Sequence, residues 1–418
     1  MELAFAMERI AILSLFAILT SANGLRNLKL AYQWTLIDYD YPSEEARQKD
    51  IDKQLFQPDE VEPFDLDVYY KGSERKIFVT TSRYCPHIPA TLSTVTNKTR
   101  NGNRVIKPYP SWEWHRDPEK CRRNSLVSVY RLFIDQCDRL WFSDNGRLGD
   151  DWLCPPRILV FDLKKDELIH TYEIPQEQHK NVSLFGTIVV EVEDPSNGCA
   201  NSFAYISDYD ARVLLVYDLK KNRSWTVSDY SFWPNAEYST FNVEGKSFTT
   251  AVSVIGMALS PPGKERILYY HALSNDIEGW IYTKYLKNES LFSEPFGQSK
   301  LFHVFPHERK AQSGGEYMDS HGNLYFGILP SAAVVSWKAN TDPESYQMGN
   351  FKIIDRDDET LQFPLGIKVR RNERGEEILW VFSTVLQRLI SNTVLFANQT
   401  NLRVLYGKIN DFRPYSTD

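Results

Sequence analysis

The chain has 418 residues, a length that ordinarily indicates two or three domains unless a repeat spreads one fold over all of it. With 42% hydrophobic and 25% charged residues it can bury a large core, which excludes a disordered chain and a polytopic membrane protein. The net charge of -7 and the lack of long Lys/Arg runs exclude a nucleic-acid partner and binding to an anionic membrane surface.

The N-terminus is typical of a secretory signal peptide over residues 1–24. A charged pair precedes the apolar run Ile10 to Leu19, and small residues follow, so we expect cleavage after Ala22 or Gly24. The alternative, a membrane anchor, is disfavoured because a helix that spans a bilayer needs about 20 apolar residues. The sequence therefore predicts a secreted, extracellular protein.

Five N-x-S/T sequons follow along the chain. In a secreted eukaryotic protein each is an acceptor for an N-linked glycan and has to lie on the surface. We therefore expect a glycoprotein. The predicted glycosylation sites are Asn97, Asn181, Asn222, Asn288 and Asn398.

Five cysteines lie in the first half of the chain, and an oxidising compartment favours two disulfides among them. They are Cys85, Cys121, Cys137, Cys154 and Cys199. Five choices of an odd cysteine and three pairings of the other four leave fifteen arrangements open. Cys85 is farthest from the others and is the predicted odd thiol, which we expect to be buried and inert; the alternative is a catalytic thiol.

The sequence offers no motif for a metal or a cofactor. His303 and His307 stand four residues apart, but the segment lacks the glutamate of a zincin and contains Pro306, which disfavours the required helix. We found no G-x-S-x-G elbow, Walker loop or G-x-G-x-x-G fingerprint. We therefore predict neither a metal nor a cofactor.

A short strand of alternating aromatic and aliphatic residues, which ends in small or polar ones, recurs six times. The steps between its central aromatic residues are 63, 64, 64, 56 and 55 residues. These six residues are Phe78, Trp141, Tyr205, Tyr269, Tyr325 and Trp380.

Most of these strands lead into a further β-type run, so each unit is predicted to be an antiparallel meander. Six such units without helical periodicity between them predict an all-β fold, a six-bladed β-propeller that forms one domain over residues 25–418. The alternative, two β-sandwiches, would not impose so regular a step. We expect a strand within residues 32–39 to complete the last blade, because pairing of the two termini removes open edges.

The chain resembles the yellow / major royal jelly protein family of insects, from about Tyr32 to Leu405. Pro-Tyr-Pro-Ser-Trp at residues 108–112 is closer to the yellow branch than to the royal jelly branch. The resemblance implies a secreted six-bladed propeller. Its other specific segments are Ile-Pro-Ala-Thr-Leu at 88–92, Asp-Gln-Cys-Asp-Arg-Leu-Trp at 135–141, Gly-Met-Ala-Leu-Ser-Pro at 256–261 and Asp-Ser-His-Gly at 319–322.

The resemblance also implies a disulfide pairing, Cys121 with Cys154 and Cys137 with Cys199. Local reasoning agrees for the second pair, because Cys137 and Cys199 stand at similar places in successive units.

A propeller concentrates its ligand contacts at the mouth of the central channel, where the innermost strands converge. Polar residues at the ends of the six repeated strands are therefore the first candidates. As catalytic residues we predict His271, Asp144 and Asp208, and as ligand-binding residues Arg83, Asn145, Tyr209, Ser383 and Thr384. Asp144, Asn145 and Gly146 also fit a turn, Asp208 fits a turn cap and Arg83 fits an internal ion pair.

Two classes of function are compatible with these residues, and the family resemblance implies examples of both. The first is an enzyme that tautomerises dopachrome-type indole quinones in melanin pigmentation and cuticle formation, which needs a positioned acid and base. The second is a protein that binds biogenic amines without turnover. The segment Val381 to Leu386 lacks the asparagine and phenylalanine expected of the amine binders, so we favour the first class. The predicted partner is a small aromatic molecule; the sequence makes no prediction of oligomeric state.

Overall fold

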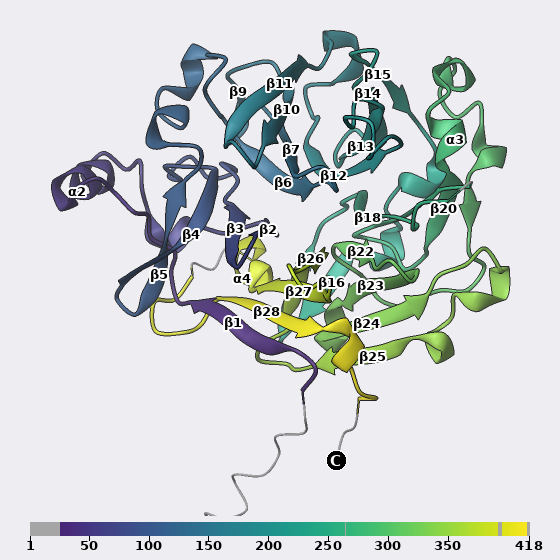
Figure 1. The fold of residues 1–418 in the computed structure, drawn as a ribbon. Helices are drawn as coiled ribbons and strands as arrows, with labels where there is room; N and C mark the ends of the chain where they lie inside the picture. The colour runs from purple at the N-terminus through teal and green to yellow at the C-terminus, as the bar shows by residue number, and fades with distance from the viewer. Residues whose placement is uncertain (1–25, 264, 392–394, 416–418) are drawn as a thin grey trace, which may run out of the picture.

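A computed structural model describes residues 26–263, 265–391 and 395–415. Six four-stranded antiparallel sheets surround a central axis, which is the predicted six-bladed β-propeller (Figure 1). The predicted signal peptide lies outside the described residues. No helix within the described ranges is long and apolar enough to cross a membrane.

Each blade starts with the strand nearest the axis and ends with the strand at the rim. The first two blades consist of β2 (Asp65–Lys71), β3 (Glu74–Thr80), β4 (Leu92–Arg100) and β5 (Asn103–Pro108), then β6 (Val129–Ile134), β7 (Arg139–Asp144), β10 (Arg157–Asp162) and β11 (Glu167–Glu173). The third and fourth consist of β12 (Phe185–Val192), β13 (Ser202–Asp208), β14 (Val213–Asp218) and β15 (Arg223–Val227), then β18 (Val254–Leu259), β19 (Ile267–Ala272), β20 (Gly279–Tyr282) and β21 (His303–Val304).

The last two blades and the smaller elements complete the described fold. The fifth blade consists of β22 (Glu316–Met318), β23 (Asn323–Ile328), β24 (Ala333–Lys338) and β25 (Lys352–Arg356), and the sixth of β26 (Phe363–Arg371), β27 (Glu377–Thr384), β28 (Leu402–Lys408) and β1 (Lys29–Trp34). Two small hairpins are formed by β8 (Arg147–Leu148) with β9 (Asp151–Trp152) and by β16 (Thr240–Val243) with β17 (Lys246–Thr249), and the short helices are α2 (Glu44–Asp52), α3 (Thr283–Leu286) and α4 (Leu386–Ile390).

The N-terminal strand closes the ring, as expected. β1 pairs antiparallel with β28, with Lys29 opposite Tyr406 and Trp34 opposite Leu402. The strand lies slightly earlier than the predicted range of 32–39, and the chain leaves the sheet after Trp34. The outer edge of the last blade is thus covered by the other end of the chain, as Figure 1 shows for the purple and yellow strands.

The six repeated strands are the second strand of each blade, which corrects our assumption that they line the channel. Their central residues Trp141, Tyr205 and Trp380 are completely buried between neighbouring blades. Aromatic side chains suit this position because both faces of the second strand are covered by other blades. The innermost strands mix charged residues, glycines and aromatic residues, as Arg131, Gly256 and Tyr317 illustrate.

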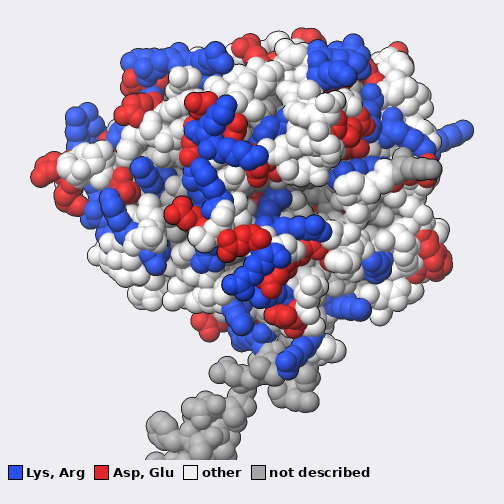
Figure 2. Space-filling view, in the orientation of Figure 1, with Lys and Arg blue, Asp and Glu red and all other residues white. Residues whose placement is uncertain are grey.

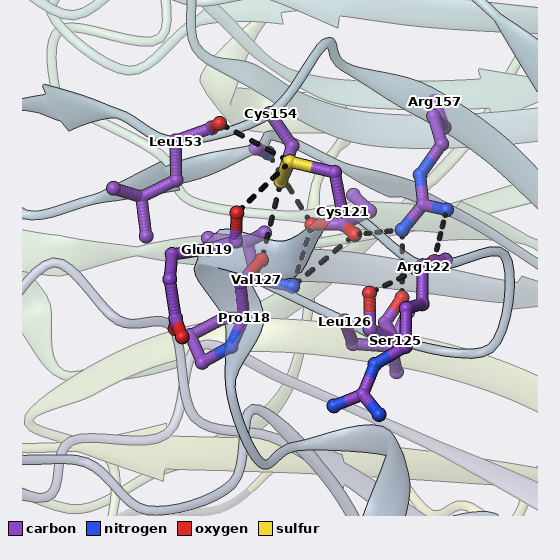
Figure 3. The surroundings of a disulfide bond; sticks show 12 residues. Pro118, Glu119, Cys121, Arg122, Ser125, Leu126, Val127, Leu153, Cys154 and Arg157 are labelled. Carbon is purple, nitrogen blue, oxygen red and sulfur yellow. Dashed lines mark hydrogen bonds and ion pairs between the residues drawn. A yellow bond between two sulfur atoms is a disulfide. The ribbon is translucent and has the colours of Figure 1, made fainter.

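The two disulfides have the pairing that the resemblance implied. Cys121 is bonded to Cys154, and Cys137 to Cys199. Figure 3 shows the first bridge against the loop of residues 118–127, where its sulfurs lie near the carbonyls of Leu153 and Pro118. Cys85 is a free, half-buried thiol, and burial raises its pKa.

Candidate functional site

The central channel opens into a cavity of about 540 Å³ at the end where the six inner strands finish. All six blades contribute to its wall, which we call the mouth. The wall includes the aromatic residues Tyr69, Phe133 and Tyr317 and the arginines Arg266 and Arg370. This volume is in the range of small-molecule sites. Figure 2 shows acidic and basic side chains intermixed over one face of the molecule, without a large field of one sign.

The opposite end of the channel, where the inner strands begin, is covered by apolar residues. The β16–β17 hairpin contributes Phe241 and Phe248, whose rings stack with centroids 4.9 Å apart. They belong to a buried cluster that also contains Leu365 of β26 and Leu386 of α4. In Figure 1 this hairpin lies near the centre of the ring, beside β26 and β27. Among the described residues, the mouth is therefore the open end of the channel.

Inside the mouth the channel narrows to a hollow of about 10 Å³, which is room for about one water molecule. Its polar lining comes from four different inner strands: Arg131 on β6, Thr187 on β12, Glu316 on β22 and Lys368 on β26. Tyr317 lines both the hollow and the mouth, so the two spaces adjoin.

The cations of this hollow are already paired. Lys368 Nζ donates a hydrogen bond of 2.9 Å to Asp65 Oδ2, and Arg131 Nη1 lies 3.8 Å from Asp65 Oδ1. Arg131 Nε donates to the hydroxyl of Tyr209 at 3.0 Å, and that hydroxyl lies 2.9 Å from Thr187 Oγ1. Tyr209, a predicted ligand-binding residue, therefore belongs to a buried network across the channel.

His271 lies at the end of β19 in a second buried network. Its Nδ1 lies 3.0 Å from Oε2 of Glu278 and 3.2 Å from Oε2 of Glu316, and its Nε2 lies 2.9 Å from the carbonyl oxygen of Gly314. The ring lies flat over Gly256 of β18, where an added Cβ would stand 2.2 Å from the imidazole. Gly256 is thus required for His271 to reach this position.

Glu316 connects His271 to the channel. Its side chain is buried in the wall of the hollow, yet neither carboxylate oxygen accepts a hydrogen bond from the residues that the structure describes. A buried carboxylate without such partners is costly, and water in the hollow is one way to satisfy it. Glu316 therefore has two carboxylate oxygens free to accept hydrogen bonds from a molecule in the hollow.

The ionisation of this network follows from its charges. Burial lowers the pKa of His271, but the carboxylates of Glu316 and Glu278 outweigh burial and raise it to about 9. Burial and the neighbouring Glu316 raise the pKa of Glu278 to about 7. Arg309 Nη1 lies 3.1 Å from Glu278 Oε2 and donates to the hydroxyl of Tyr346 at 2.6 Å. At neutral pH His271 is thus a cation held between two carboxyl groups.

The same donor atoms have a spacing that suits a metal ion. One atom each from His271, Glu278 and Glu316 lie within 4.8 Å of one another. However, Arg309 already supplies a positive charge to Glu278, and protonated His271 is the counter-ion of Glu316, 3.2 Å away and without a hydrogen bond. The charges of His271, Glu278 and Glu316 are balanced within this ion network, so we assign no metal to it.

Asp144 is held in contacts that stabilise the fold. Its carboxylate accepts hydrogen bonds from the amides of Val127 and Ser128, and Arg157 Nη2 donates to Oδ2 at 2.8 Å. Arg157 also donates to the carbonyl of Ser125 in the loop drawn in Figure 3. These contacts hold the loop that precedes β6 against β7 and β10.

Three further predicted residues bind backbone groups at the covered end. Asn145 exchanges hydrogen bonds of 2.7 and 2.8 Å with the backbone of Phe185. Asp208 accepts from the amides of Leu184 and Ala211, as a turn cap does. The guanidinium of Arg83 donates to five backbone carbonyls, at Ile88, Pro89, His115, Leu126 and Val127.

Ser383 and Thr384 end β27 at the covered end and are also buried. Thr384 Oγ1 accepts a hydrogen bond from the amide of Leu386 at the start of α4. Glu62 is a neighbour of Thr384, and burial raises the pKa of its carboxyl to about 8. Among the predicted residues, the contacts bring only Tyr209 and His271 to the channel wall in networks that include residues lining the hollow.

Sequence reasoning missed Glu316, Glu278, Arg131 and Lys368. The usable signal was positional. Charged residues stand in the strand that precedes five of the six aromatic repeats, as Arg131 does ten residues before Trp141, and β18 is the exception. Once the aromatic strand is known to be second in its blade, the preceding strand is the one that lines the channel.

The chain is similar to known proteins over most of its length. The family profile described as major royal jelly protein matches residues 127–415. Dopaminechrome tautomerase from Drosophila melanogaster is 31% identical over 391 residues, which cover 92% of this chain and 82% of that protein. Major royal jelly protein 7 from Apis mellifera is 30% identical over 406 residues, which cover 94% of this chain and 87% of that protein.

Among solved structures, virginiamycin B lyase from Staphylococcus aureus overlaps with a TM-score of 0.40 at 13% identity, covering 84% of this chain and 96% of that chain. We draw no argument from this likeness.

Proposed function

Because the chain belongs to the major royal jelly protein family, we propose that it is a secreted protein of melanin pigmentation and cuticle formation that tautomerises dopachrome-type indole quinones. Two disulfides support secretion, because such bonds persist in oxidising compartments. The name of the Drosophila relative supports the class of reaction.

The observation that carries the proposal is the carboxylate of Glu316. It is buried in the channel wall, free of hydrogen bonds from described residues, and 3.2 Å from a histidine that is protonated at neutral pH. Tautomerisation to a dihydroxyindole breaks two C–H bonds of the five-membered ring, one at C2 and one at C3, and forms two O–H bonds at the quinone oxygens. It needs one group that accepts a proton and one that returns it, and no external oxidant.

Glu316 is the proposed proton-transfer residue, and His271 with Glu278 are positioning residues that hold it. The substrate would lie in the mouth, because the hollow beside Glu316 has room for about one water. That water would carry the proton between Glu316 and the ring, as general acid–base catalysis through one water allows. Asp144 and Asp208 are the alternative proton-transfer residues, and we favour Glu316 over them because backbone amides already hold both aspartates.

The test is the rate at which the purified secreted protein removes the colour of dopachrome and of dopaminechrome, relative to buffer. Glu316→Gln should lower kcat by about 10²- to 10⁴-fold. The matched control is Glu289→Gln, which changes an exposed carboxylate paired with Arg223. Thermal unfolding of both variants checks that each is folded.

Two results would overturn the proposal. Loss of colour no faster than in buffer, together with stoichiometric binding of dopamine or serotonin by calorimetry, would favour the amine-binding class. Full activity of folded Glu316→Gln would exclude Glu316 as the proton-transfer residue.

A further inference from the structure

The charges of the mouth are almost all paired. Each carboxylate that lines it has a basic partner. Arg370 has an acidic partner, because its guanidinium binds Asp67 with Nε at 2.6 Å from Oδ1. The carboxylate pairs are Asp135 with Arg139 at 2.7 Å, Asp138 with Lys164 at 2.8 Å and Glu377 with Arg371 at 3.5 Å. Among the residues that the structure describes, the mouth therefore presents no free carboxylate to a cationic ligand.

Arg266 differs from these residues. It lies at the end of the turn that joins β18 to β19 and lines both the mouth and an adjoining pocket of about 130 Å³. Its guanidinium makes no hydrogen bond or ion pair with the described residues, and its Nε is buried without a partner. A half-buried guanidinium with unused donors is unfavourable unless a ligand or water accepts from it.

The acidic side chain that raises the pKa of Arg266 does not neutralise it. Glu191 raises the pKa of Arg266, whereas burial lowers it, and burial prevails. Glu191 is itself occupied, because its Oε1 lies 3.0 Å from Lys287 Nζ and its Oε2 accepts from the hydroxyl of Tyr205 at 2.7 Å. Among the described cations that line the mouth, Arg266 is thus the one without an ion-pair partner.

An aromatic wall stands in the same cavity. The rings of Phe133 and Tyr317 are stacked, with centroids 6.0 Å apart and planes 20° from parallel. Arg370 lies over both rings, at 5.2 and 5.1 Å from their centroids, and its Nη1 donates to the hydroxyl of Tyr317. These contacts fix the rings, and both rings line the pocket and the mouth together with Arg266.

We propose that Arg266 binds the carboxylate of a planar aromatic acid that lies against Phe133 and Tyr317. Arg is suited to this role because its planar fork matches a carboxylate with two parallel hydrogen bonds. If the proposed tautomerase function holds, on which this substrate assignment rests, the substrate is a carboxylated indole quinone such as dopachrome. The decarboxylated analogue, dopaminechrome, would lack the group that Arg266 binds.

The first experiment measures binding without turnover. Calorimetry compares indole-2-carboxylate with indole, two unreactive ligands that differ in the carboxylate. The wild-type protein should bind the acid about 10- to 100-fold more tightly, which is the effect of a hydrogen bond to a charged group. Arg266→Gln should abolish this preference, and Arg266→Lys should keep part of it.

The matched control is Arg374→Gln, which removes the same charge from an exposed turn at the same end of the propeller. This control should keep the preference for the acid, because Arg374 does not line the mouth. Equal affinity of the wild-type protein for the acid and for indole would overturn the inference. The same preference in Arg266→Gln as in the wild-type protein would also overturn it.

The second experiment separates this inference from the proposed function. The wild-type protein should have about 10- to 100-fold higher kcat/KM for dopachrome than for dopaminechrome, and Arg266→Gln should reduce this ratio to about one. If neither compound is turned over while indole-2-carboxylate binding still depends on Arg266, the enzyme proposal fails and the carboxylate site stands. If both are turned over equally well, the enzyme proposal stands and the carboxylate site fails.

Discussion

Arg157 and Asp144 form a buried ion pair in which Nη2 lies 2.8 Å from Oδ2, and both side chains are at most 9% exposed. Asp144→Asn should destabilise the protein by about 3–5 kcal/mol, because breaking a buried pair leaves a charge without compensation. Chemical denaturation of the wild-type and variant proteins measures the difference.

Asp150→Asn is the control for this change, because Asp150 pairs with Arg147 at 3.4 Å and is 98% exposed. It should cost less than about 1 kcal/mol. If Asp144→Asn unfolds like the control but loses tautomerase activity, Asp144 acts in catalysis and the structural interpretation is wrong.

The fold was predictable because aromatic residues recur at a regular spacing along the chain. Trp141 and Tyr205 are buried on strands that lie between other strands of their blades. Such a position favours large aromatic side chains, and their regular spacing can be recognised in the sequence. The closing strand was predictable because an open edge at β28 requires a partner from the other terminus.

The candidate site was less predictable, because its members belong together only in three dimensions. Glu316 and His271 are 45 residues apart in sequence and on different blades, yet their charged atoms lie 3.2 Å apart. The residues next to Glu316 in the sequence do not distinguish it from a solvent-exposed glutamate. The aromatic repeat predicted the end of β19, where His271 lies, but it did not identify the strands that face the channel.

Glu62 should make stability depend on pH. The carboxyl is 3% exposed, neither oxygen has a hydrogen-bond partner among the described residues, and burial raises the pKa to about 8 from an ordinary 4.5. Between these values the unfolded chain releases a proton that the folded protein keeps. Stability is therefore lost as pH rises through this window, by a total on the order of 5 kcal/mol.

Glu62→Gln removes this titration. The difference in unfolding free energy between variant and wild type should grow in favour of the variant from pH 5 to pH 8, as measured by denaturant unfolding at each pH. Glu45→Gln, an exposed change on α2, should show no such trend. If the unfolding free energies of Glu62→Gln and the wild type change with pH in the same way, Glu62 does not have the raised pKa.

All five predicted glycosylation sites are accessible. The side chains of Asn97, Asn181, Asn222, Asn288 and Asn398 are exposed. We expect protein secreted from insect cells to lose mass on treatment with an N-glycosidase, and each Asn→Gln variant to lack one increment of that mass. Asn350→Gln, at an exposed asparagine outside a sequon, should leave the mass of the glycans unchanged. A sequon whose variant matches the wild type carries no glycan.

The Cys137–Cys199 bridge should stabilise the protein mainly through the unfolded chain. It links two positions 62 residues apart and joins the second blade to the third. A loop of this length restricts the unfolded ensemble, which corresponds to about 4 kcal/mol in the chain-entropy treatment. The double variant Cys137→Ala, Cys199→Ala should therefore unfold at a clearly lower denaturant concentration than the wild type. Cys85→Ser is the control, because Cys85 is a free thiol, and it should shift the midpoint little. If the double variant and the control have the same denaturation midpoint, the bridge does not stabilise the protein. The contacts between the two blades then hold them in place without it.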